Sequence, residues 1–257
     1  MLGAIAGDVI GSVYERHPIK TTDFPLFQPR SRFTDDTVMM CAVAHAILSR
    51  EEYGPAIKAF GRRYPGAGYG AKFRQWLVSP SFIPYGSWGN GSAMRVIPVG
   101  WAFDTVDAVL DEARKTAEVT HNHPEGIKGA QAAALAVYLA RTGSGKAGIS
   151  AEISKRFKYD LTRTLEEIRP FYEFEVSCQR SVPQSIRAFL ESDGVEDAIR
   201  KAVSLGGDSD TMACIAGGVA EAFYGGVPEQ LGRFTRIRLP EDLLEVVNTF
   251  QERYCGR

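Results

Sequence analysis

Two acidic clusters hold the residues best suited to chemistry. One reads Phe33-Thr-Asp-Asp-Thr37 and the other Gly206-Gly-Asp-Ser-Asp-Thr211, and each directly precedes an apolar segment. If those segments are helices packed side by side, the carboxylates meet and repel one another by about 4 kcal/mol per close pair at an effective dielectric near 20. Bound cations would offset this repulsion, and two divalent ions match four acids.

The donor atoms in these clusters decide which metal they suit. Both clusters offer carboxylate and threonine hydroxyl oxygens, and neither contains Cys or His. Such hard donors favour magnesium, manganese or calcium over zinc. A pair of such ions, roughly 3.5 to 4 Å apart, can orient a substrate diol and stabilise developing charge. The alternative is that Thr34 and Asp208 are helix N-caps and the other acids complement the helix dipoles.

Asp8 and Glu15 form a second acidic feature. They are seven residues apart, so on a helix they share a face with Gly11 and Ser12. A solvated acidic face is one interpretation. Because Asp8 is embedded among apolar residues, the other is a carboxylate that acts as a general base.

Two further motifs suit an anionic ligand. In Trp88-Gly-Asn-Gly-Ser92 the glycines let backbone N–H groups approach an anion, and Trp88 can stack on a base. An ordinary turn is the alternative. The segment Thr120–Gly126 carries His121 and His123 just before a predicted helix. These histidines cap that helix or hydrogen-bond to a phosphate or ribose.

The elements that must position these residues are helices. Apolar residues recur at three and four positions over 127–138 and 239–254, and strict alternation is almost absent. The fold is therefore predicted to be all-α. Segments 38–48 and 212–224 are apolar nearly all round and rich in small residues, which predicts two central helices in close contact.

Glycines and irregular stretches complete the organisation. Gly3, Gly7 and Gly11 form a ridge on which another helix or a ligand can approach the backbone. The irregular stretches 16–33 and 61–92 are long enough to be functional loops. We expect one domain spanning 1–257, with a possible small helical lobe at 143–180.

Composition limits the partners and the setting. The 257 residues carry 30 Lys and Arg against 31 Asp and Glu, so no basic excess predicts nucleic acid or an anionic membrane as an obligate partner. No apolar run reaches the ~18 residues of a membrane span. The four cysteines lie far apart without a CxxC pair, and Asp8 interrupts the apolar N-terminus, which predicts a reducing, cytoplasmic setting without export.

Taken together and in this order, the motifs resemble the ADP-ribosylglycohydrolase family, which includes the dinitrogenase reductase-activating glycohydrolase. The resemblance runs nearly end to end. Its marks are Gly3-Ala-Ile-Ala-Gly-Asp-Val-Ile-Gly-Ser-Val-Tyr-Glu15, Phe33-Thr-Asp-Asp-Thr37, Gly89-Asn-Gly-Ser-Ala-Met-Arg95, His121-Asn-His-Pro124 and Gly206-Gly-Asp-Ser-Asp-Thr211.

The resemblance implies a compact orthogonal helical bundle with a central cleft that holds two divalent ions, Mg²⁺ or Mn²⁺. It implies that the distal ribose of ADP-ribose meets the metals, with Glu15 and Asp36 as the catalytic residues. The implied metal ligands are Thr34, Asp35, Asp36, Asp208, Asp210 and Thr211. The residues expected to bind substrate are Asp8, Trp88, Gly89, Asn90, Gly91, Ser92 and His121.

The expected activity is metal-dependent cleavage at the anomeric carbon of a terminal ADP-ribosyl group, which releases ADP-ribose. Family members that act on arginine carry an extra Asp before the Gly-x-x-Met-Arg segment, where this chain reads Tyr85-Gly-Ser-Trp-Gly89. This difference favours an O-linked acceptor. The alternatives are a non-catalytic ADP-ribose-binding protein and a metal-dependent phosphohydrolase. We expect a monomer.

Overall fold

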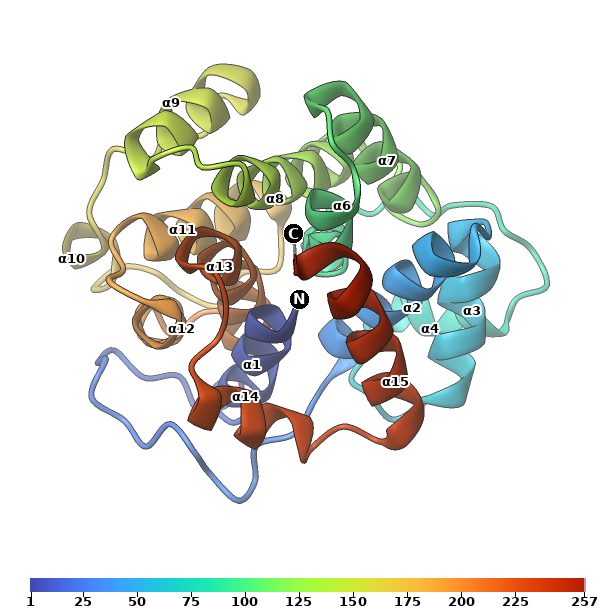
Figure 1. Cartoon of the computed structure of the whole chain (residues 1–257), viewed down its shortest axis with the longest axis horizontal. Helices are drawn as coiled ribbons and strands as arrows, with labels where there is room; N and C mark the ends of the chain where they lie inside the picture. Colours follow the sequence, from blue (N-terminus) through green and yellow to red (C-terminus); the bar gives the residue numbers. More distant parts are fainter. Residues whose placement is uncertain (257) are drawn as a thin grey trace.

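The computed structural model describes residues 1–256, which fold into fifteen α-helices and a terminal π-helical turn without any β-strand in that range (Figure 1). The elements are α1 (Leu2–Gly11), α2 (Asp35–Ser49), α3 (Tyr53–Arg63), α4 (Ala71–Val78), α5 (Gly91–Met94), α6 (Ile97–Ala102), α7 (Val106–Glu118), α8 (Pro124–Arg141), α9 (Lys146–Phe157), α10 (Leu165–Ile168), α11 (Cys178–Leu190), α12 (Val195–Val203), α13 (Ser209–Tyr224), α14 (Glu229–Arg236), α15 (Glu241–Phe250) and η1 (Gln251–Cys255). The all-α prediction is confirmed.

Helices α1 and α13 form the centre of the molecule. Every residue of α1 is buried, and α13 packs against α1, α8, α11 and α12. The glycine ridge makes this possible: a Cβ on Gly3 would lie 2.6 Å from the carbonyl oxygen of Gly217, and one on Gly7 would overlap the backbone of Ala213. The two backbones are therefore in direct contact. The ridge serves helix packing, one of the two roles that its sequence predicted.

Helix α2 is the second central element. It packs against α3, α6 and α15, and it also touches α1 and α13 (Figure 1). Its predicted apolar stretch 38–48 lies within the observed helix, just as 212–224 lies within α13. The N-terminal ends of α2 and α13 consequently carry the two acidic clusters.

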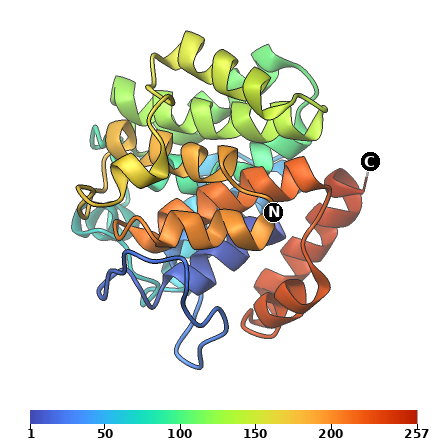
Figure 2. The ribbon, with the colours of Figure 1, turned by 90° about the vertical axis from the view of Figure 1, so that its left-hand side faces the viewer.

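Segment 143–180 contains α9, α10 and an irregular stretch that leads to α11. Ile149 and Ile153 of α9 and Leu165 and Ile168 of α10 are buried in the same apolar cluster as the central helices. In the view of Figure 2, α8 and α9 form the layers above α11 and α13. The chain thus builds a single compact domain around one core.

No helix within residues 1–256 is both long enough and apolar enough to cross a membrane.

Candidate metal centre and active site

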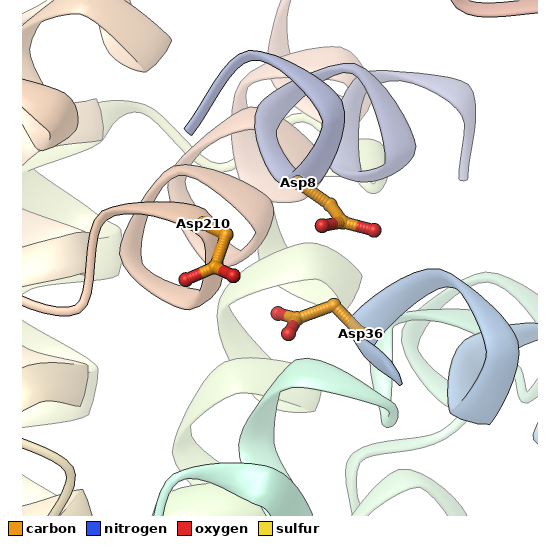
Figure 3. A group of neighbouring side chains, drawn as sticks. All are labelled: Asp8, Asp36 and Asp210. Atoms are coloured by element: carbon orange, nitrogen blue, oxygen red, sulfur yellow. The ribbon is translucent and has the colours of Figure 1, made fainter. Parts of the chain in front are cut away.

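The centre of the site lies where α1, α2 and α13 meet. Asp8, Asp36 and Asp210, one from each helix, direct their carboxylates into one space (Figure 3). The hydroxyl of Thr211 donates to Asp36 at 3.2 Å and so connects α13 to α2. The two acidic clusters are therefore adjacent, as their positions before central helices predicted.

Two groups of three carboxylates share one member. Asp8, Asp36 and Asp210 place oxygens within 4.8 Å of one another, and Glu15, Asp208 and Asp210 do the same. Asp210 is the residue common to both groups. A carboxylate has two oxygens and can contribute to both groups at once. This is the arrangement expected for two neighbouring cation sites.

The carboxylates destabilise one another's charged forms. The pKa of Asp35 is raised from 3.8 to about 8, first by burial and then by the charge of Asp8. Burial and neighbouring carboxylates hold the pKa of Asp36 and of Asp210 well above the ordinary range. Burial also raises the pKa of Asp208. Without a bound cation, Asp35, Asp36 and Asp210 therefore favour their protonated forms.

The residues at this centre fit hard divalent cations. Oδ1 of Asp36 is buried and has no hydrogen-bond partner among the residues described. Asp208 stands at the N-cap position of α13 but makes no capping hydrogen bond with its side chain. Oxygen atoms left unsatisfied in this way are typical of Mg²⁺, Mn²⁺ or Ca²⁺ ligands.

The helix-cap alternative is thus right for α2 and wrong for Asp208. The backbone N–H of Asp36 donates to the Thr34 hydroxyl at 3.3 Å, which caps α2. Asp208 instead accepts a hydrogen bond from Asn90 Nδ2 at 2.7 Å. This contact brings the Trp88–Ser92 loop to the acidic centre.

Asp8 is one of the three carboxylates of the centre, but it does not line the cavity. Its side chain is fully buried and accepts hydrogen bonds from the backbone N–H groups of Thr34 and Thr37, at 3.0 and 3.1 Å. It also accepts from both threonine hydroxyls. Burial raises the pKa of Asp8 to about 6 despite these donors. Asp8 therefore fastens α1 to the start of α2.

Glu15 follows α1 and lies at the edge of the cavity. Burial and the charge of Asp208 raise its pKa, and the charges of Arg16 and Arg32 oppose that rise. A carboxylate that borders a cavity can act as a general base toward a ligand bound there. Glu15 borders this cavity, and its pKa is raised.

The cavity over these acids has a volume of about 470 Å³, within the usual range for small-molecule sites. Of the predicted residues it is lined by Glu15, Thr34, Asp35, Asp36, Gly89, Asn90, Gly91, His121, Asp208, Asp210 and Thr211. Trp88 and Ser92 do not line it. The Trp88 ring is half exposed and faces His123, while the Ser92 hydroxyl donates to the Gly126 carbonyl oxygen at 2.7 Å.

The two histidines before α8 have separate roles. His123 caps the helix, because its Nδ1 accepts from the backbone N–H of Glu125 at 3.1 Å. His121 is buried at the cavity wall, and a Cβ added to Gly91 would lie 3.2 Å from its Nε2. His123 therefore takes the capping role that the sequence offered for both histidines, while His121 lines the cavity, where it can hydrogen-bond to a ligand.

A hydrogen-bond relay favours one tautomer of His121. Arg95 Nη2 donates to the Thr120 hydroxyl oxygen at 2.9 Å, and that oxygen lies 2.7 Å from His121 Nδ1. Burial and then the charge of Arg95 hold the pKa of His121 well below its ordinary value, so the ring is neutral. Thr120 also hydrogen-bonds to Tyr85. If the Thr120 hydroxyl donates to Nδ1 of His121, the ring proton lies on Nε2. His121 then offers a donor at the cavity wall.

The family model for ADP-ribosylglycohydrolase matches residues 1–254. The chain belongs to the ADP-ribosylglycohydrolase family. This membership identifies it as an ADP-ribosyl hydrolase, an enzyme that cleaves a glycosyl bond, and ADP-ribosylated molecules as its class of substrate.

Individual relatives agree with this membership. The chain is 28% identical to the "ADP-ribosylhydrolase ARH3" of Gallus gallus, covering 99% of this chain and 92% of that protein. It is 24% identical to the "ADP-ribosylarginine hydrolase Tri1" of Pseudomonas putida, covering 90% and 71%. A solved "ADP-ribosylglycohydrolase-related protein complex" shares the fold with a TM-score of 0.76 at 24% identity, covering 98% of this chain and 95% of that one.

Several residues that line the cavity of this ADP-ribosylglycohydrolase were not predicted from the sequence. Tyr85 and Gly68 come from stretch 61–92, which was predicted to be irregular but contains α4. The sequence marks Tyr85 only as part of the loop Tyr85–Gly89, and Gly68 only through the length and glycine content of the stretch. Phe174 and Val176 come from the irregular stretch before α11, where nothing in the sequence marks them. They reach the cavity because the N–H of Asn90 donates to the Val176 carbonyl oxygen at 2.8 Å.

Proposed function

We propose that the chain binds two divalent cations, Mg²⁺ or Mn²⁺, and hydrolyses the bond at the anomeric carbon of a terminal ADP-ribosyl group to release ADP-ribose. The proposed metal ligands are Thr34, Asp35, Asp36, Asp208, Asp210 and Thr211. The observation that carries this proposal is the pair of carboxylate groups that share Asp210. When bound, the cations orient the ribose hydroxyls and stabilise the charge that develops as the bond breaks.

Glu15 is the proposed general base. As the bond from the anomeric carbon to the acceptor breaks, water adds to that carbon and loses a proton to Glu15, and Glu15 returns that proton to the leaving acceptor. The raised pKa of Glu15 supports both proton transfers. Its position beside Asp208 and Asp210, within the proposed metal centre, supports this role.

The wall formed by Asn90, Gly91 and His121 is proposed to hold the diphosphate. Asn90 is fixed by its hydrogen bond to Asp208, and Gly91 has no side chain to cover its backbone. The Nε2 proton of His121 adds a donor there. A neutral donor of this kind binds an anion without itself titrating near pH 7.

The remaining predicted residues take supporting roles in this proposal. Asp8 orients Thr34 through two hydrogen bonds and so positions a metal ligand. Trp88 and Ser92 lie outside the cavity lining, where Trp88 can reach only a ligand that extends beyond the mouth. Asp36 acts through the metal centre.

An O-linked acceptor is favoured over arginine. The acids that line the cavity are Glu15, Asp35, Asp36, Asp208 and Asp210, and all of them belong to the proposed catalytic and metal centre. No further carboxylate among the described lining residues remains to pair with a guanidinium group. Arg16 and Arg32, beside Glu15, would repel one.

A reducing, cytoplasmic setting is also part of the proposal. Its support is that all four cysteines are free thiols, three of them buried.

The test is a product assay by mass spectrometry with Mg²⁺, on Ser-linked, Arg-linked, nucleic-acid-linked, polymeric and O-acetyl ADP-ribose. We expect intact ADP-ribose from an O-linked substrate and none from the Asp208→Asn variant. AMP plus ribose phosphate would instead indicate a phosphohydrolase. Binding of ADP-ribose without any product would indicate a non-catalytic binder.

A further inference from the structure

Three cations line the mouth of the cavity without a protein partner. Arg16, Arg32 and Lys72 are exposed residues of the cavity lining, and none forms an ion pair or a side-chain hydrogen bond with another residue in 1–256. Some basic side chains elsewhere on the surface are paired with acids one helical turn away, as Arg156 is with Glu152. The three cations at the mouth are thus available to a ligand.

These cations are concentrated at the bond-cleaving end. The charges of Arg16 and Arg32 act on Glu15, where they oppose the rise of its pKa caused by burial. Arg16 follows Glu15 directly in the chain, and Arg16 and Arg32 line the same cavity as Glu15. They therefore lie near the proposed base, where the acceptor leaves.

The charge balance of the cavity leaves these cations uncompensated. Five carboxylates line it, and all belong to the proposed catalytic and metal centre. Two divalent cations would supply four positive charges against those five, and Arg16, Arg32 and Lys72 outweigh the one negative charge that remains. The mouth beside Glu15 then carries a net positive field, which attracts anionic groups on the acceptor and repels cationic ones.

We propose that this mouth selects acidic polypeptide segments, in which Asp or Glu residues flank the ADP-ribosylated residue. The inference rests on the proposed function and names the acceptor class of the same site. A polypeptide fits better than a nucleic acid, because proteins that bind a phosphate backbone do so with many basic residues. This chain has no such excess of basic residues, since its formal net charge is -1.

The experiment compares Ser-linked ADP-ribosyl peptides of one length that differ only in having Glu, Ala or Lys on both sides of the serine. We expect kcat/KM for ADP-ribose release to be about tenfold higher for the Glu peptide than for the Lys peptide, with the difference shrinking as salt is added. Because the ratio is taken within one enzyme variant, changes in basal activity cancel.

Charge variants test the residues. In Arg16→Glu/Arg32→Glu the preference should invert, in Arg16→Gln/Arg32→Gln it should approach unity, and in Arg16→Lys/Arg32→Lys it should persist. The matched control is Arg74→Glu/Arg233→Glu, which changes the net charge equally with two exposed arginines that do not line this cavity. The control should keep the wild-type preference.

Each contrary result has a distinct meaning. Equal cleavage of all three peptides overturns the inference and leaves the proposed function intact, whereas no ADP-ribose from any substrate overturns the proposed function. Loss of affinity for free ADP-ribose in Arg16→Gln/Arg32→Gln would mean that these cations hold the diphosphate. Faster release from a nucleic-acid-linked substrate than from the Glu peptide would overturn the assignment to polypeptides.

Discussion

The starts of α2 and α13 carry similar pairs of acids, but the two helix starts differ in their hydrogen bonds. At α2, Thr34 caps the helix and Asp8 accepts four hydrogen bonds from Thr34 and Thr37. At α13, the Asp208 side chain makes no capping hydrogen bond and accepts from Asn90. The Thr34 cap and the Asp8 hydrogen bonds at the start of α2 are therefore built without a ligand, whereas Asp36 Oδ1 and the acids at the start of α13 are left for a ligand to complete.

The largest expected effect on catalysis comes from changing Asp210, the residue that belongs to both carboxylate groups. Asp210→Asn removes the shared carboxylate, so we expect kcat for ADP-ribose release to fall by about 10³-fold or more. Asp208→Asn removes a carboxylate from one group only and should cost less. The measurement is steady-state kinetics with saturating Mg²⁺. A variant of Asp210 more active than the matched variant of Asp208 would contradict the shared role.

Glu15→Gln tests the chemical step at the α13 half. We expect kcat to fall by about 10²- to 10⁴-fold because the proton acceptor is lost. The dissociation constant for ADP-ribose, measured by calorimetry, should stay within a few-fold of wild type. Unchanged turnover with excess Mg²⁺ would eliminate Glu15 as the base.

Asp8→Ala tests the half that is already built. Four buried donors at the start of α2 lose their acceptor, so we expect the free energy of unfolding to drop by about 2 to 4 kcal/mol. Chemical denaturation of the metal-free protein measures this. Asp36→Ala, at the same helix start, removes a carboxylate whose Oδ1 has no partner and should cost far less or stabilise the metal-free protein. The reverse order would remove the distinction between the two acids.

The pH dependence of metal binding follows from the raised pKa values. Asp35, with a pKa raised from 3.8 to about 8, holds a proton in the folded metal-free protein that the unfolded chain has already released. Stability without metal therefore falls as pH rises through this window. Metal binding displaces the protons, so the increase in Tm caused by Mg²⁺ should be greater at about pH 8 than at about pH 6. An equal increase at both pH values would contradict the assignment.

The smallest effect is expected at the wall proposed for the diphosphate. Thr120→Val removes the hydroxyl that favours the Nε2 proton of His121, and we expect affinity for ADP-ribose to fall by about three- to tenfold. Thr120→Ser should restore it. Nitrogen NMR of the imidazole provides an independent readout, because it reports the tautomer directly. A wild-type ring protonated on Nδ1 would overturn the relay.

The sequence predicted the central helices from local patterns, and it predicted the meeting of the two acidic clusters because each cluster directly precedes one of those helices. Apolar stretches with small residues specify buried helices, and the glycine ridge on α1 specifies contact with a backbone. The attachment of Asp8 to α2 could not be predicted, since its partners lie 26 and 29 positions away. The separate roles of His121 and His123 depend equally on tertiary neighbours.

The most direct test of the account is the number and coupling of bound metal ions. Mn²⁺ titrated into the metal-free protein and followed by electron paramagnetic resonance should show two ions per chain that are magnetically coupled. Asp210→Asn should lose that coupling, because it lacks the carboxylate common to both groups. A single Mn²⁺ per chain, or two uncoupled ions in the wild type, would contradict a dinuclear centre built around Asp210.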